Sequence, residues 1–253
     1  MDQVTFSVMM RRLESISLEM TQALERSAWS SIIALCHDFS CVIYDAKGRQ
    51  LSVYDPIPAL VTSLELVVDA IEESFGADIA DGDVFLCNDP YRGNTHVGDL
   101  VISRPVFVEG RLMFWLMIKA HHIDVGAFEP ASCTAAAKDT FQEGLQIPPL
   151  KIVAGGTPRL DVLELILSNV RLRNLVEGDL LAQIGSAERG HRLILEFCDE
   201  FGLDTVEEYG EEVIAYADRR MGAMIERIPD GSYRGSGWVD SDGYAVKNVP
   251  VEV

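Results

Sequence analysis

The chain has 253 residues, 48% of them hydrophobic, which is enough to build a core for one large domain or two small ones. Acidic residues outnumber basic ones by 40 to 21, so the negative field argues against nucleic acid and anionic membranes as partners. The five cysteines are odd in number and show no CxxC spacing, which favours a reducing, cytoplasmic location. We expect no membrane association, because the sequence has no apolar run of transmembrane length and no visible export signal.

The first part of the chain alternates between helical and strand patterns. Apolar residues at intervals of three and four predict an amphipathic helix from residue 6 to about residue 34. A strand over 37–45, a turn and a return strand over 50–53 are expected to follow as a hairpin. A second amphipathic helix is predicted over 60–75, where Gly76 has the character of a helix C-cap.

The middle of the chain predicts strands and the remainder predicts helices. Apolar runs at 84–87, 100–102 and 112–118 are expected to be strands, with a hairpin turn at 109–111 between the last two. Helical patterns then cover three segments, at residues 160–167, 178–201 and 205–228. Because the strands cluster in hairpins and do not alternate with helices, we predict a mixed α+β fold, with long amphipathic helices packed on hairpin-built β layers.

Three regions follow from this pattern. Residues 1–158 form an α/β region with the candidate site, and residues 159–228 form a helical region. Residues 229–253 are expected to begin a β-rich region that looks truncated, because the last residues form an alternating strand. An unpaired terminal strand needs a partner, either from another chain or from a missing continuation.

A polar loop at residues 88–99 concentrates groups that bind ligands. It contains His96 and Asp99 between two predicted strands, and His121, His122 and Asp124 follow the next strand. Two histidines with one or two aspartates suit a divalent metal such as zinc, manganese or iron. The spacing alone leaves open whether these groups bind a metal or only hydrogen-bond within the fold, and which of the two adjacent histidines takes part.

Ordered motifs along nearly the whole chain point to a known family. They are Asp38-Phe39-Ser40-Cys41, Asn88-Asp89-Pro90-Tyr91-x-Gly93-x-Thr95-His96-x-x-Asp99, Ala120-His121-His122-x-Asp124-x-Gly126, Gln142-Glu143-Gly144-Leu145-x-Ile147-Pro148-Pro149-x-Lys151 and Gly178-Asp179-Leu180-x-Ala182-Gln183. With these motifs the sequence resembles the hydantoinase B/oxoprolinase family. Two features depart from it: Asn94 and Gly98 stand where the family loop commonly has glycine and proline, and family members usually continue well beyond residue 253.

The resemblance implies roles for individual residues. It implies a metal held by His96, Asp99 and His121, with Asp38 as a fourth ligand, although an aspartate at a helix-to-strand junction is often only a cap. His122 and Asp124 would orient the ligands and serve the catalytic site. Glu143 would be a general base, or a surface residue. The remaining predicted residues would bind substrate: Asn88, Asp89 and Tyr91 by shaping the pocket, and Arg92 by binding a phosphate, unless Arg92 is only an exposed loop charge.

The resemblance also implies an ATP-dependent complex. In that family an A-type subunit of actin-like kinase fold phosphorylates the substrate, and the B-type chain completes hydrolysis of a cyclic amide or carboxylation of a ketone. ATP is expected to bind the partner, because this sequence has no Walker A phosphate loop and no GxGxxG after a strand. Three functions stay open: a cyclic-amide hydrolase subunit, a ketone carboxylase subunit, and a non-catalytic scaffold. The first two predict a hetero-oligomer.

Overall fold

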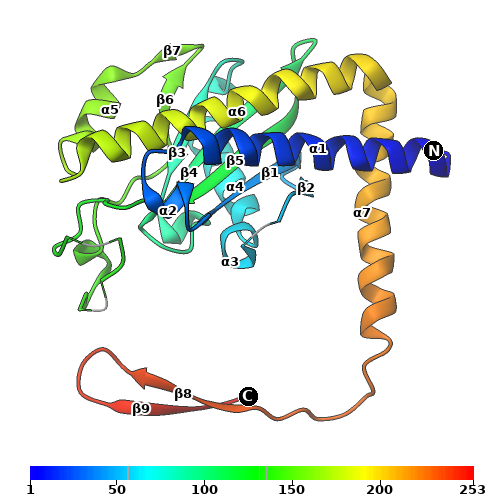
Figure 1. Cartoon of the computed structure of the whole chain (residues 1–253). Coiled ribbons are helices and arrows are strands. Elements are labelled where there is room, and N and C mark those ends of the chain that lie inside the picture. Colours follow the sequence, from blue (N-terminus) through cyan, green and yellow to red (C-terminus); the bar gives the residue numbers. More distant parts are fainter. Residues whose placement is uncertain (56, 131, 135) are drawn as a thin grey trace.

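A seven-stranded antiparallel sheet forms the centre of the computed structural model, which describes residues 1–55, 57–130, 132–134 and 136–253. The strand order is β2-β1-β5-β4-β3-β6-β7 (Figure 1). The strands are β1 (Phe39–Asp45), β2 (Gln50–Val53), β3 (Val84–Cys87), β4 (Asp99–Val108), β5 (Arg111–His121), β6 (Leu150–Ala154) and β7 (Thr157–Pro158). The longest strands, β4 and β5, therefore pair near the middle of the sheet.

Helices cover both faces of this sheet. Helices α1 (Gln3–Ser27) and α6 (Arg173–Phe201) cross one face, and α4 (Leu64–Phe75) lies on the other (Figure 1). Successive residues of β1 show the two environments: Cys41 packs in the cluster with α1 and α6, whereas Val42 packs in the cluster with α4. Because both faces are buried, the central strands read in the sequence as continuous apolar runs.

The remaining helices are short or leave the body of the protein. Three short helices connect the larger elements, namely α2 (Ser31–Ala34), α3 (Pro58–Val61) and α5 (Leu160–Leu167). Helix α7 (Leu203–Ile225) extends away from the sheet towards an exposed hairpin formed by β8 (Ser236–Ser241) and β9 (Lys247–Glu252) (Figure 1). The predicted mixed α+β fold, with long helices on hairpin-built β layers, is confirmed. Within the described ranges, no helix is both long enough and apolar enough to cross a membrane.

The first helix ends earlier than its sequence pattern predicts. The pattern extends to about residue 34, but α1 stops at Ser27 and α2 starts separately at Ser31. The Asp179 carboxylate on α6 accepts hydrogen bonds from the backbone N–H groups of Trp29, at 2.7 Å, and Ser30, at 3.0 Å. This contact spans about 150 residues of sequence, so local periodicity could not reveal the break.

Helix α6 joins the helical region to the sheet in one core. Its buried face carries Ser186, whose hydroxyl donates to the backbone oxygen of Met20 on α1 at 2.8 Å. Apolar residues of α6, including Leu180 and Ile194, belong to the same buried cluster as α1 and the central strands. The predicted helical region thus packs directly on the region that contains the candidate site.

Candidate metal centre

The pairing of β4 with β5 brings two of the predicted metal ligands together. Asp99 and His121 are direct cross-strand partners, and Asp99 Oδ1 lies 2.7 Å from His121 Nδ1. Alternate residues of a strand point to opposite faces, so these side chains share the face of Val101, which packs in the cluster with α4. The neighbouring His122 points to the other face, where it is fully buried and contacts Gln183 of α6.

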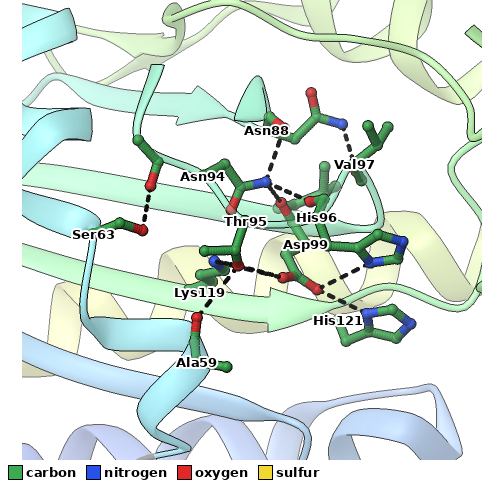
Figure 2. A network of polar contacts seen from close by, with 12 residues as sticks. Ala59, Ser63, Asn88, Asn94, Thr95, His96, Val97, Asp99, Lys119 and His121 are labelled. Atoms are coloured by element: carbon green, nitrogen blue, oxygen red, sulfur yellow. Dashed lines mark hydrogen bonds and ion pairs between the residues drawn. The ribbon is translucent and has the colours of Figure 1, made fainter. Parts of the chain in front are cut away.

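The loop before β4 supplies the third group. The rings of His96 and His121 stack with their centroids 5.1 Å apart and 11° between their planes. His96 Nδ1 lies 3.7 Å from Asp99 Oδ1 (Figure 2). A Cβ atom on Gly98 would lie 2.7 Å from His96 Cε1, so the imidazole occupies space that a larger residue at 98 would fill. Possible ligand atoms of His96, Asp99 and His121 all lie within 4.8 Å of one another.

Two buried asparagines hold this loop in shape. The Asn94 amide nitrogen donates to the backbone oxygens of Asn88 at 2.8 Å, His96 at 2.5 Å and Asp99 at 2.9 Å (Figure 2). Asn88 in turn donates to the backbone oxygens of Val97, at 2.7 Å, and Leu145, at 2.9 Å, and its Oδ1 atom accepts from the N–H group of Ile147 at 2.6 Å. The side chain of Asn88, for which the resemblance implies a place in the substrate pocket, is buried and joins the loop to the segment that contains Leu145 and Ile147.

Lys119 is a functional candidate that the sequence analysis missed. Its side chain is fully buried, and its Nζ atom lies 3.5 Å from Asp99 Oδ2 and donates to Thr95 Oγ1 (Figure 2). The two oxygens of Asp99 thus face different groups: Oδ1 faces the histidines, and Oδ2 faces the ammonium group. The available signal was a charged residue inside an apolar strand, two positions before His121 and therefore on the same face.

These contacts set the charges at the site. Burial opposes ionisation of Asp99, but the hydrogen bond from His121, the nearby His96 ring and the charge of Lys119 together lower its pKa well below the usual range. The nearby Asp99 carboxylate raises the pKa of His96, and burial only partly opposes this. Burial lowers the pKa of Lys119, against the attraction of Asp99. The carboxylate is thus ionised at neutral pH and available as a metal ligand.

The donor set fits a divalent metal. Two imidazole nitrogens and one carboxylate oxygen are ligands that zinc, manganese and iron accept. Three protein ligands also leave room in the coordination sphere for water or substrate. The backbone of Asp38, the predicted fourth ligand, lies beside this group. Its carbonyl oxygen accepts a hydrogen bond from the His121 N–H group at 2.9 Å. Its carboxylate is not part of the three-residue group.

The two predicted catalytic carboxylates lie in different surroundings. Glu143 Oε2 is 3.8 Å from His96 Nε2, so this half-buried carboxylate faces the candidate metal ligands. Asp124 is buried, and its oxygens accept from the backbone N–H groups of Gly126, at 2.9 Å, and Leu172, at 3.0 Å. Asp124 therefore ties the strand end to the start of α6 and is not brought into the metal group.

The other predicted substrate-binding residues, Asp89, Tyr91 and Arg92, lie on the outer side of the loop. Tyr91 is 87% exposed, and Asp89 accepts a hydrogen bond from its N–H group at 2.9 Å. Arg92 Nη1 lies 3.8 Å from Glu73 Oε2, and Arg92 Nε lies 3.7 Å from Asp89 Oδ2. Tyr91 and Arg92 are accessible to a ligand or a partner, but the structure does not group them with the histidines.

Comparison with known proteins shows what the chain is similar to. It is 36% identical to caprolactamase subunit beta of Pseudomonas jessenii, over 99% of this chain and 43% of that protein. It is 31% identical to 5-oxoprolinase of Dictyostelium discoideum, over 90% of this chain and 18% of that protein. It is 32% identical to the acetophenone carboxylase delta subunit of Aromatoleum aromaticum, over 67% of this chain and 25% of that subunit.

The fold is shared as well. A crystal structure of ATP-dependent caprolactamase from Pseudomonas jessenii matches with a TM-score of 0.92 at 36% identity, over 100% of this chain and 44% of that chain. The chain therefore spans less than half the length of the relatives it matches. The model of the hydantoinase B/oxoprolinase family matches residues 2–253. On this evidence the chain belongs to the hydantoinase B/oxoprolinase family.

Proposed function

We propose that the chain is the B-type catalytic part of an ATP-dependent cyclic-amide hydrolase that acts at a divalent-metal site. The observation that carries this proposal is the convergence of His96, Asp99 and His121, from a loop and two paired strands, within 4.8 Å. The similarity to caprolactamase subunit beta and to 5-oxoprolinase supports a cyclic amide as the substrate class. The substrate would reach the site already phosphorylated by a separate A-type subunit of actin-like kinase fold.

The residues at the site suit the hydrolytic half of such a reaction. His96, Asp99 and His121 would hold the metal, and a metal bound there supplies Lewis-acid chemistry. Glu143, whose carboxylate faces His96, is placed to accept a proton from an attacking water. Lys119 holds the second oxygen of Asp99 and so keeps the first directed at the histidines. Asp38 is our candidate for a further ligand, because its backbone is fixed beside His121.

A ketone carboxylase is the second candidate function. It is favoured by the match to the acetophenone carboxylase delta subunit. The same site would then serve the addition of carbon dioxide to an activated ketone. Purified complex with its kinase-like partner distinguishes the two functions: ATP-dependent ring opening of a lactam or hydantoin supports the hydrolase, and ATP-dependent incorporation of labelled bicarbonate into a ketone supports the carboxylase.

Elemental analysis of the purified chain tests the metal site itself. We expect one divalent metal per chain in the wild type, loss of this metal in His96→Ala, and retention in His191→Gln. The matched control is suitable because His191 lies on α6, with its nearest carboxylate oxygen, of Asp81, 4.0 Å away. A wild-type chain that takes up no zinc, manganese or iron would instead support a non-catalytic scaffold.

A further inference from the structure

Gln183 makes three hydrogen bonds from the buried face of α6. Its amide nitrogen donates to the backbone oxygen of Leu100 on β4, at 3.0 Å, and to that of Ile118 on β5, at 3.1 Å. Its Oε1 atom lies 2.8 Å from His122 Nε2. The residue is fully buried, so no water competes for these bonds. One side chain thus contacts both central strands at once.

The geometry also fixes the tautomer of His122, that is, which ring nitrogen carries the proton. Both amide hydrogens of Gln183 point to backbone oxygens, so its Oε1 atom is an acceptor. His122 must then carry its proton on Nε2. Its Nδ1 atom is buried and has no partner among the described residues. The whole side chain of His122 therefore depends on Gln183 for its one polar contact.

Two of the three residues that Gln183 contacts are next to a metal-ligand candidate in the sequence. Leu100 follows Asp99 in β4, and His122 follows His121 at the end of β5. The ligand side chains point to the opposite face of the sheet, towards the cluster with α4, while Gln183 reaches the strands from the face covered by α6. Gln183 can therefore set the position of the ligands without touching them.

We infer that Gln183 is a positioning residue for the metal centre. By clamping β4 and β5 together at their ligand-bearing ends, it sets the separation between Asp99 and His121. This inference rests on the proposed function, because it assumes that these residues bind a metal. Partners beyond the first ligands commonly change metal affinity by about 10- to 100-fold when they are removed.

Ser186 provides a matched control on the same helix. It is equally buried, one turn after Gln183, and its hydroxyl donates to Met20 O on α1 at 2.8 Å and lies 3.7 Å from Cys41 Sγ on β1. None of these contacts involves the ligand-bearing ends of β4 and β5. If α6 acts only through general packing, removing either polar side chain lowers stability and leaves metal binding alone.

The test compares Gln183→Met with Ser186→Ala in the full chain. Zinc affinity is measured by competition with a chelator, the visible d–d spectrum is recorded after loading with Co²⁺, and urea unfolding is followed without metal. We expect both variants to lose stability. Only Gln183→Met should weaken zinc binding, by about 10- to 100-fold, and alter the Co²⁺ spectrum, which reports ligand geometry.

The outcomes separate this inference from the proposed function. If the wild type binds zinc and Gln183→Met binds it equally tightly with an unchanged Co²⁺ spectrum, Gln183 is only structural. If the wild type binds neither metal, the metal centre fails and this inference fails with it. Should Gln183→Met not fold, His122→Leu breaks one arm of the clamp and leaves both strand contacts of Gln183. It is then expected to show the same spectral change in weaker form, and an unchanged spectrum would contradict the inference.

Discussion

Asp99 and His121 face each other across the β4–β5 pair, with Oδ1 of the carboxylate 2.7 Å from Nδ1 of the imidazole. The hydrogen bond places a proton between these two atoms, and both of them are candidate metal ligands. Metal binding to histidine requires the neutral ring and releases protons. A metal that binds to both of these atoms must therefore displace the proton between them.

Metal affinity should fall on acidification, starting at a higher pH than for an ordinary histidine. The nearby Asp99 carboxylate raises the pKa of His96 above its usual value of 6.5, so protons displace metal sooner as the pH falls. The charged His96 also stabilises the metal-free protein. This stabilisation is complete below the unfolded-state pKa and is lost as the pH rises through the folded-state pKa.

Chelator competition between about pH 6 and pH 9 measures this dependence. Urea unfolding of the metal-free chain over the same range should show that its stability falls as the pH rises. A zinc affinity that stays constant until the pH drops below about 6.5, the value of an unperturbed histidine, would contradict the predicted role of His96.

Lys119→Met should strongly destabilise the metal-free protein. The substitution keeps most of the length of the side chain but leaves the buried Asp99 carboxylate without its cation, and breaking a buried ion pair costs about 3–5 kcal/mol. Lys47→Met is the matched control, because Lys47 is 67% exposed and pairs with Glu211 at 2.7 Å. A surface pair of this kind contributes about 1 kcal/mol or less. Urea unfolding of both variants measures the difference, and equal losses would refute it.

Gly98→Ala should disturb the His96 ring. The added Cβ atom would lie 2.7 Å from His96 Cε1 and 3.0 Å from the backbone oxygen of Ser132, so the imidazole must move. We expect zinc affinity to fall about tenfold, and overpacking to cost about 1–3 kcal/mol. Gly185→Ala is the control, because open space surrounds Gly185 on α6 and alanine favours helix by about 1 kcal/mol. Zinc binding as tight as in the wild type would mean that the ring can shift without loss.

Asn88→Ala should unfold the loop locally or destabilise the whole chain. The substitution leaves the backbone groups of Val97, Leu145 and Ile147 without their partner, and each unpaired buried group costs about 1–3 kcal/mol. Tyr91→Ala, at an 87% exposed position in the same loop, should change stability by less than about 0.5 kcal/mol. Thermal unfolding compares the two. In the assembled complex, an effect of Tyr91→Ala on KM would support its predicted contact with substrate.

Local patterns in the sequence were sufficient for most of the elements. The β1–β2 and β4–β5 hairpins were predicted because their turns have local signals, and Glu109 and Gly110 both adopt the positive φ that a tight two-residue turn requires. The end of α1 was predicted wrongly, since the break at Trp29 depends on Asp179, distant in the sequence. Interactions of this kind are set by packing and leave no periodic signal.

The candidate site was only partly predictable. Spacing could not decide between His121 and His122; in the structure His121 lies beside Asp99 and His96, and His122 contacts Gln183, because adjacent strand residues point to opposite faces. Lys119 was missed because buried lysines are rare and the run around it reads as plain core. The resemblance suggested that Asn88 binds substrate; local patterns did not reveal that its buried side chain also bonds to the backbone of Val97, Leu145 and Ile147.

The topology of the sheet also favours an order of folding. A two-residue turn joins β4 to β5, so Asp99 and His121 meet at a small cost in chain entropy, as in hairpins that form in about 1–10 µs. Gln183 reaches these strands from 61 residues beyond His122, and the contact between α6 and α1 closes a separation of 166 residues. Asp99 and His121 can therefore meet early, whereas we expect α6, which carries Gln183, to dock late. On the proposed metal role, we expect tight metal uptake only at the last stage of folding, because a refolding chain that already contains the β4–β5 hairpin would still release metal readily until α6 is in place.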